Sequence, residues 1–286
     1  MVRISKLCLE QTISRNDRTG GKEGVMGNRI SVMGLELDML SEEAFQTELK
    51  EFLSNDSFNV VHMISLDYMD SYEENEQVRE TLEEADLILP GEKAILSSCH
   101  VDVLETAGMV VDYRSALNLC DGDMLAGRKC YLVLRNKKEA KVAYRYIATH
   151  HPYMEIVGLY TAESSVTQEA LVNDINTKLP DLIIMSMEGI RGEEWLHENR
   201  VKINAKLCVV LSSVMDIIIR ENIHIPVWIK RLHLGKAYTR MARIPYANVW
   251  RRRIFRKKMD NYNTRKLMEM AEVREELSNE DEGNEP

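Results

Sequence analysis

Short apolar runs alternate with amphipathic helical segments along most of the chain, and this alternation constrains the fold more than any other feature. The runs are rich in Val, Ile and Leu and cover residues 30–37, 58–64, 86–89, 129–134, 155–160, 181–187 and 207–213. Helical patterns cover residues 68–84, 137–149, 167–177 and 193–202. Strands that are apolar on both faces and separated by helices indicate βαβ units. We therefore predict an α/β fold, a Rossmann-like parallel sheet flanked by helices.

The composition of the 286-residue chain is typical of a globular protein. Hydrophobic residues make up 44% and charged residues 29%, which argues against collagen-like, wholly disordered and multi-span membrane classes. The best candidate for a membrane span, residues 208–219, is shorter than the roughly 18 apolar residues required and contains Asp216. The five cysteines are widely spread without a CxxC pair, and the patterns GxGxxG and GxxxxGK[ST] are absent. We expect no metal centre and no cofactor.

The charge is distributed very unevenly. Net charge is −9, yet residues 222–259 contain eleven Lys and Arg and no Asp or Glu, so the remainder carries −20. Aromatic residues lie between these cations, a composition that suits an anionic membrane surface. There are two alternatives: the basic segment could fold against the acidic body, or it could bind nucleic acid. We favour the membrane and expect no nucleic-acid partner. The predicted contacts with the membrane or with a diphosphate are Arg231, Arg240, Arg251, Arg252 and Arg253.

These patterns predict four segments. Residues 1–28 form a flexible leader without the apolar stretch of a secretory signal, and residues 29–220 form the Rossmann-like domain. Residues 221–268 form a basic helical C-terminal appendage that associates with the membrane, and residues 269–286 form an acidic tail. We expect a cytoplasmic protein, peripheral at the inner face of the cell membrane.

A parallel sheet binds its ligands beyond the carboxyl ends of its strands. The residues that follow the predicted strands include four carboxylates, several hydroxyls and two lysines, but no histidine or cysteine. This set disfavours a Ser-His-Asp or Cys-His nucleophile system. It suits a carboxylate general base acting on an alcohol, with cations and helix N-termini holding a diphosphate leaving group.

At these strand ends the sequence resembles the WecG/TagA/CpsF glycosyltransferase family. The resemblance covers roughly residues 30–253 and includes ISVMGLELD at 30–38, ADLILP at 85–90, PDLII at 180–184, EEWL at 193–196, NR at 199–200 and PVW at 226–228. It implies transfer of N-acetylmannosamine or another hexose from a UDP-sugar to a polyprenyl-diphosphate-linked acceptor, in cell-wall, capsule or exopolysaccharide synthesis. It also implies an inverting, metal-independent reaction. Whether the chain forms a homo-oligomer or works with a partner glycosyltransferase is left open.

The sequence departs from the family pattern at the residues that carry the chemistry. After the Leu-Pro step the family has an aspartate, which acts as the catalytic base, followed by a glycine. This chain has Gly91 and Glu92 at these two positions. A glycine pair after the fourth strand is replaced by Arg135 and Asn136. In one interpretation Glu92 takes over as the catalytic base. In the alternative the protein is a catalytically degenerate scaffold or regulator of a membrane glycosyltransferase. The candidate substrate-binding residues are Ser65, Asp67, Gly91, Lys137, Glu188, Gly192, Glu193, Ser212, Ser213 and Asp216.

Overall fold

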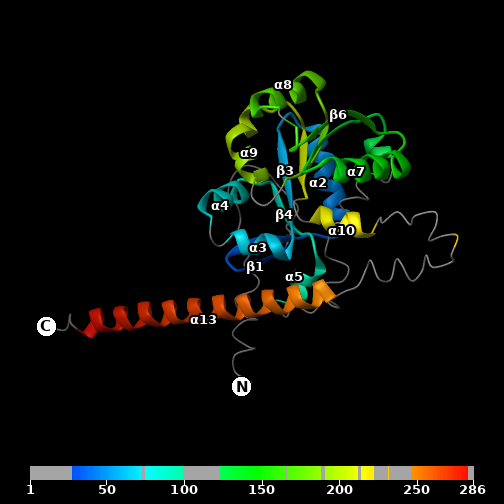
Figure 1. Cartoon of the computed structure of the whole chain (residues 1–286). Helices are drawn as coiled ribbons and strands as arrows, with labels where there is room; N and C mark the ends of the chain where they lie inside the picture. Colours follow the sequence, from blue (N-terminus) through cyan, green and yellow to red (C-terminus); the bar gives the residue numbers. More distant parts are fainter. Residues whose placement is uncertain are drawn as a thin grey trace.

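Six of the apolar runs form one parallel sheet in the computed structural model (Figure 1). The structure describes residues 28–72, 75–98, 123–164, 166–187, 191–211, 214–221, 231 and 246–282. The strands are β3 (Asn59–Ile64), β4 (Leu87–Pro90), β5 (Lys129–Leu134), β6 (Glu155–Thr161), β7 (Leu182–Ser186) and β8 (Leu207–Val210). Their order is β4-β3-β8-β7-β5-β6, and every adjacent pair is parallel. The predicted α/β fold is confirmed.

Helices cover both faces of this sheet because its strands are apolar on both sides. One face packs against α2 (Glu42–Ser54), α7 (Lys137–His150) and α10 (Val214–Glu221), through residues such as Val61 and Met63 of β3. The other face packs against α8 (Gln168–Lys178) and α9 (Arg191–Asn199), through residues such as Ile183 and Met185 of β7. Figure 1 shows α7 and α8 on different sides of the strands. Consecutive strand residues therefore point alternately into one core and the other, as βαβ units require.

The predicted strand at residues 30–37 is in fact a hairpin. Strands β1 (Asn28–Val32) and β2 (Leu35–Met39) pair antiparallel around Met33 and Gly34, whose φ angles are 52° and 84°. Glycine adopts this left-handed conformation without steric cost, so the turn can form. Asp38 of β2 accepts a hydrogen bond from Ile88 N–H at 2.9 Å, which attaches the hairpin to β4 at the edge of the sheet.

The helical pattern at residues 68–84 also divides in two. Helix α3 (Leu66–Tyr72) follows β3 directly, and α4 (Glu76–Glu83) begins after Asn75, whose side chain accepts a hydrogen bond from Val78 N–H at 3.2 Å. An asparagine in extended conformation with this bond is an N-cap, so it starts a new helix. Short helix α5 (Lys93–Ser98) follows β4, and two 3-10 turns, η1 (Asp123–Leu125) and η2 (Arg200–Lys202), precede β5 and β8.

The C-terminal helix α13 (Tyr246–Glu282) is 37 residues long and lies across α3 and α5 (Figure 1). Phe255 and Met259 are buried in the core formed by the hairpin, α3, α4 and α5, and Tyr262 packs against that core. The helix then continues past the body, and its end lies well away from the sheet (Figure 1). No helix in the described ranges has an apolar stretch that could cross a membrane.

Candidate active site at the carboxyl ends of the strands

Glu92 lies at the end of β4 and connects three elements of the fold. Its Oε1 accepts a hydrogen bond from the backbone N–H of Leu66 at 3.3 Å, at the first residue of α3. The same oxygen accepts a second bond from the guanidinium of Arg251 at 3.2 Å, in α13. Glu92 is buried, and among the described residues both of its side-chain bonds fall on Oε1. The predicted base and a predicted membrane cation are therefore in direct contact.

Gly91 leaves no room for a side chain. A Cβ atom at this position would lie 2.5 Å from Val214 Cγ2 and 2.8 Å from the carbonyl oxygen of Ile64. The Gly91 N–H donates to the same carbonyl at 2.7 Å, so β3 and β4 approach each other closely here. An aspartate here, as the family pattern has it, would clash with α10 unless the backbone moved. The structure thus places the first carboxylate after β4 at Glu92.

Ser65 directly follows β3 and precedes Leu66, whose N–H bonds Glu92. The Ser65 hydroxyl is fully buried and accepts a hydrogen bond from Tyr68 N–H at 3.3 Å, which caps the start of α3. Asp67 is the second residue of α3. Ser65, Gly91 and Glu92, three of the predicted site residues, are therefore brought together around the adjacent ends of β3 and β4.

A second cluster surrounds Arg135 at the end of β5. The Arg135 guanidinium holds Asp216 of α10 through two hydrogen bonds, of 2.6 and 3.2 Å, and donates a third to Glu139 at 3.0 Å. Burial lowers the pKa of Arg135, but the hydrogen bonds to Asp216 and Glu139 outweigh it and raise the pKa overall. This cluster joins β5 and α7 to α10. Because Arg135 is neutralised by two carboxylates, it offers little net charge to an anion.

The start of α7 contributes the exposed Lys137 to this region. Asn136 caps the helix by accepting a hydrogen bond from Glu139 N–H at 2.9 Å, and Lys137 N–H donates to Glu163 at 3.3 Å. The buried Glu139 returns to accept the Arg135 N–H at 3.1 Å. The Asn-x-x-Glu spacing resembles a capping box, although Glu139 bonds the N–H of Arg135 and not that of the cap Asn136. This spacing could have identified Glu139 from sequence, and the site prediction omitted it.

Glu193 lies on the other side of the sheet, inside the fold. Its Oε1 is 3.7 Å from Nδ1 of His62 on β3, and both side chains are fully buried. Burial, together with the positive charge of Arg200, lowers the pKa of His62 from 6.5 to about 3, so His62 is neutral at physiological pH. Burial and the nearby Glu193 carboxylate raise the pKa of Tyr68. His62 and Tyr68 lie within elements predicted from their apolar pattern, which gives no signal of this polar cluster.

Not all predicted residues meet in one place. Gly192 is buried at the start of α9, where a Cβ would lie 3.5 Å from Met185 Sδ, next to Glu193 and apart from the Glu92 contacts. Glu188, Ser212 and Ser213 lie outside the described residues. The link between the first two clusters is Val214, which touches Gly91 and lies in the same helix as Asp216.

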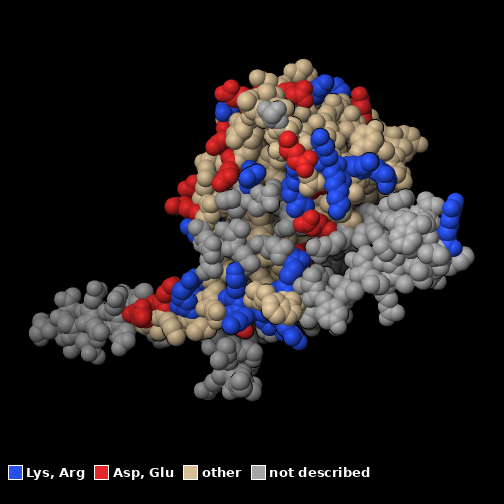
Figure 2. All heavy atoms as spheres, in the orientation of Figure 1, with Lys and Arg blue, Asp and Glu red and all other residues tan. Residues whose placement is uncertain are grey.

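The predicted cations of the appendage differ in their surroundings. Arg251 is half-buried against Glu92, whereas Arg252 and Arg253 are exposed on α13. Arg231 is exposed, and Arg240 lies outside the described residues. In Figure 2 Lys and Arg gather along the part of α13 beneath the body, and Asp and Glu appear toward its free end.

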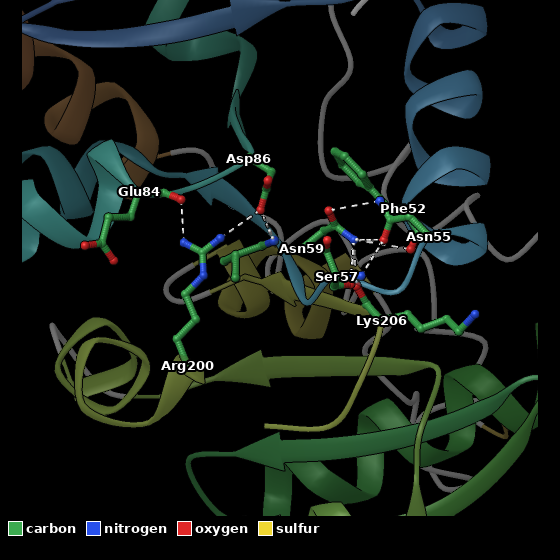
Figure 3. A network of polar contacts seen from close by, with 9 residues as sticks. Phe52, Asn55, Ser57, Asn59, Glu84, Asp86, Arg200 and Lys206 are labelled. Carbon is green, nitrogen blue, oxygen red and sulfur yellow. Dashed lines mark hydrogen bonds and ion pairs between the residues drawn. The ribbon is translucent and has the colours of Figure 1, made fainter. Parts of the chain in front are cut away.

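Arg200 and its neighbours form a network at the opposite, amino end of the strands (Figure 3). Arg200 bonds the carbonyl of Glu84 and the carboxylate of Asp86, and Asp86 accepts the N–H of Val60 at 2.8 Å. Beside it, the buried Asn59 side chain donates to the carbonyls of Phe52, Ser57 and Lys206. These bonds tie the strand starts together, and they assign Arg200, part of the family-like NR step, to the scaffold.

The strand connections mark where a ligand would sit. The chain leaves β5 toward β6 on one side and leaves β7 toward β8 on the other, and β5 and β7 are adjacent. Such a reversal is a topological switch point, the usual ligand position in an open α/β sheet. Arg135 and Lys137 follow β5 at this point. Within the described ranges no group of three His, Cys, Asp or Glu residues could hold a metal ion.

Comparison with known proteins agrees with this architecture. No curated protein matches the chain. Residues 30–258 match the Glycosyl transferase WecG/TagA/CpsF family, a range that runs from β1 into α13 and includes both Glu92 and Arg251. Since the match covers most of the sequence, the chain belongs to the WecG/TagA/CpsF family of glycosyltransferases.

Proposed function

We propose that the protein transfers a hexose of the N-acetylmannosamine type from a UDP-sugar to a polyprenyl-diphosphate-linked acceptor, in cell-wall, capsule or exopolysaccharide synthesis. The observation that carries this proposal is the family match, which spans the whole sheet and the first part of α13. The reaction is an inverting, metal-independent displacement in which one carboxylate deprotonates the acceptor hydroxyl. The transfer takes place at the inner face of the cell membrane.

The UDP-sugar lies at the switch point between β5 and β7. The amino end of α7, a 14-residue helix, points its positive dipole end toward a diphosphate placed there. Lys137 and Lys138 are exposed in its first turn and supply positive charge that no described carboxylate side chain neutralises through an ion pair. Arg135 does not serve this purpose, because Asp216 and Glu139 already hold it.

Glu92 is the base in this proposal. Leu66 N–H and Arg251 both bond Oε1 and orient the carboxylate, so Oε2 is the oxygen that takes the proton. A base must lie within hydrogen-bond reach of the hydroxyl that it activates. The acceptor therefore approaches beside the ends of β3 and β4, where Ser65 and α3 form the wall.

The exposed cations of α13 hold the enzyme on the membrane that carries the acceptor. Arg252, Arg253, Arg256 and Lys257 are exposed, and the Trp250 side chain is 68% exposed beside them. Cations with an exposed indole suit the headgroup region of an anionic bilayer.

The test is release of UDP from a panel of UDP-hexoses in the presence of vesicles that contain polyprenyl-diphosphate-linked sugars, with calorimetric titration of UDP alone. Acceptor-dependent UDP release from one donor supports the proposal. Absence of both turnover and UDP binding across the panel contradicts it and identifies the protein as a non-catalytic scaffold.

A further inference from the structure

Two segments of α13, one in each half of the helix, carry equal and opposite charge. Residues 250–258 contain six Lys and Arg and no Asp or Glu, a charge of +6, whereas residues 269–282 contain seven Asp and Glu and one Arg, a charge of −6. Both segments belong to one continuous helix. Figure 2 shows the basic part against the body and acidic side chains farther along the helix.

The acidic half cannot neutralise the basic half of its own chain. Along a helix with a rise of 1.5 Å per residue, the centres of the two segments near residues 254 and 276 are about 33 Å apart. The Debye length at physiological salt is about 8 Å, so the charges at this distance are largely screened from each other. Within the basic half Arg251 is paired with Glu92 of the body, whereas Arg252, Arg253, Arg256 and Lys257 are exposed and can face the acidic half of another chain.

We propose that a second copy of this chain docks along α13 in antiparallel orientation. A two-fold axis near Thr264 would set the basic half of each helix alongside the acidic half of the other. Such an arrangement satisfies both halves with a single self-complementary surface, as two-fold dimers require. An anionic membrane would repel the acidic half, so it fits only the basic one.

The apolar side chains of α13 support the same occupant. Past the body, Leu267, Met268 and Met270 are 50%, 61% and 50% exposed, and Ile254 in the basic half is 43% exposed. Exposed apolar residues in both halves of a long helix gain stability when a second helix covers them. The overlap of residues 250–278 would run for about 43 Å, or about eight helical turns.

Sedimentation velocity of the full chain at micromolar concentrations tests this proposal. We expect a dimer of the 33.0 kDa chain at low salt. Raising NaCl from roughly 50 mM to roughly 500 mM, which shortens the Debye length from about 14 to about 4 Å, should raise the dissociation constant at least about tenfold.

Two charge-reversal sets make the test specific. The basic set is Arg252→Glu, Arg253→Glu, Arg256→Glu and Lys257→Glu, and the acidic set is Glu269→Lys, Glu272→Lys, Glu275→Lys and Glu276→Lys. Each set alone leaves like charges facing each other and should give monomers, whereas the eight substitutions together restore opposite charges and should restore the dimer.

Circular dichroism of every variant identifies loss of folding, and a folded monomeric variant supports the proposal only when the combined variant dimerises again. A chain that is monomeric at low salt overturns it, even if that chain floats with anionic vesicles. Dimers that persist unchanged in both single sets also overturn it.

Discussion

A substitution of Glu92 gives the most direct test of the catalytic proposal. Glu92→Gln keeps the shape of the side chain and its place beside Leu66 N–H but removes the charge that accepts a proton. We expect kcat to fall by about 10² to 10⁴, the usual contribution of a general base. UDP release at saturating donor and acceptor measures this effect.

The matched control is Glu155→Gln, an exposed glutamate at the amino end of β6, on the opposite edge of the sheet. It should leave kcat unchanged. If Glu92→Gln retains full kcat while folding normally, the base is another residue, and Glu92 serves only to join α3 and α13.

The buried His62 should make the free energy of unfolding depend on pH. Its pKa is about 3 in the folded chain and about 6.5 in the unfolded chain, so the unfolded state binds a proton first as the pH falls. The stability present above pH 6.5 is therefore lost progressively between pH 6.5 and pH 3. Between pH 7 and pH 5 this single group should lower the free energy of unfolding by about 2 kcal/mol.

Urea unfolding at the two pH values measures the difference, and His62→Gln should reduce it by that amount, since glutamine does not titrate. His197→Gln, at an exposed position of α9, serves as the control and should leave the pH dependence intact. An identical pH dependence in His62→Gln and the natural chain would mean that His62 is not the buried neutral group described above.

At this scale the sequence predicted positions better than contacts. Glu92 and Ser65 could be selected because residues that follow parallel strands meet at one edge. The bond between Glu92 and Arg251 joins residues 159 positions apart, and no periodicity encodes it. The same holds for His62 and Glu193, because a β-strand pattern predicts burial of His62 but not which carboxylate faces it.

Among the elements, α13 depends on very few apolar side chains for its attachment to the body. Phe255 is 2% exposed, and it packs with Met259 into the core shared by the hairpin and α3. Phe255→Ala should lower the free energy of unfolding by about 3 kcal/mol. If detaching the first part of α13 costs less free energy than that, the helix should detach instead. Detachment would also remove Arg251 from Glu92.

Hydrogen exchange measures this change locally, and we expect faster exchange in α3, α5 and residues 250–262. Ile254→Ala is the matched control because the neighbouring Ile254 is 43% exposed and should have little effect. Equal exchange in the two variants would show that α13 is attached by other contacts.

Element boundaries were the least predictable part of the fold. The six strands of the parallel sheet follow from apolar runs, but the run at residues 30–37 also fits a hairpin once Met33 and Gly34 adopt positive φ. Likewise the periodic pattern at residues 68–84 continues across Asn75, although Asn75 starts a new helix. In both places local turn and capping chemistry prevailed over the longer periodic signal.

On the scale of the whole molecule, the two proposals above assign two competing partners to one surface. The exposed cations of residues 250–258 can face an anionic membrane or the acidic half of α13 in a second copy. Each Lys or Arg near an anionic bilayer contributes about 1 kcal/mol, so four such residues correspond to roughly a thousandfold in binding. A dimer that covers them would withhold this contribution until it dissociates.

The acidic reversal set separates the two partners in a flotation assay with anionic vesicles. It leaves every cation of residues 250–258 in place, adds four more along the helix and disfavours the dimer, so we expect it to float more strongly than the natural chain. The basic set should lose flotation, and vesicles of zwitterionic lipid should retain neither protein. If the acidic set floats no better than the natural chain, the membrane does not compete with self-association for α13. If the basic set floats unchanged, the cations of α13 do not attach the protein to the bilayer, and the placement of the acceptor site at the membrane must rest on another surface.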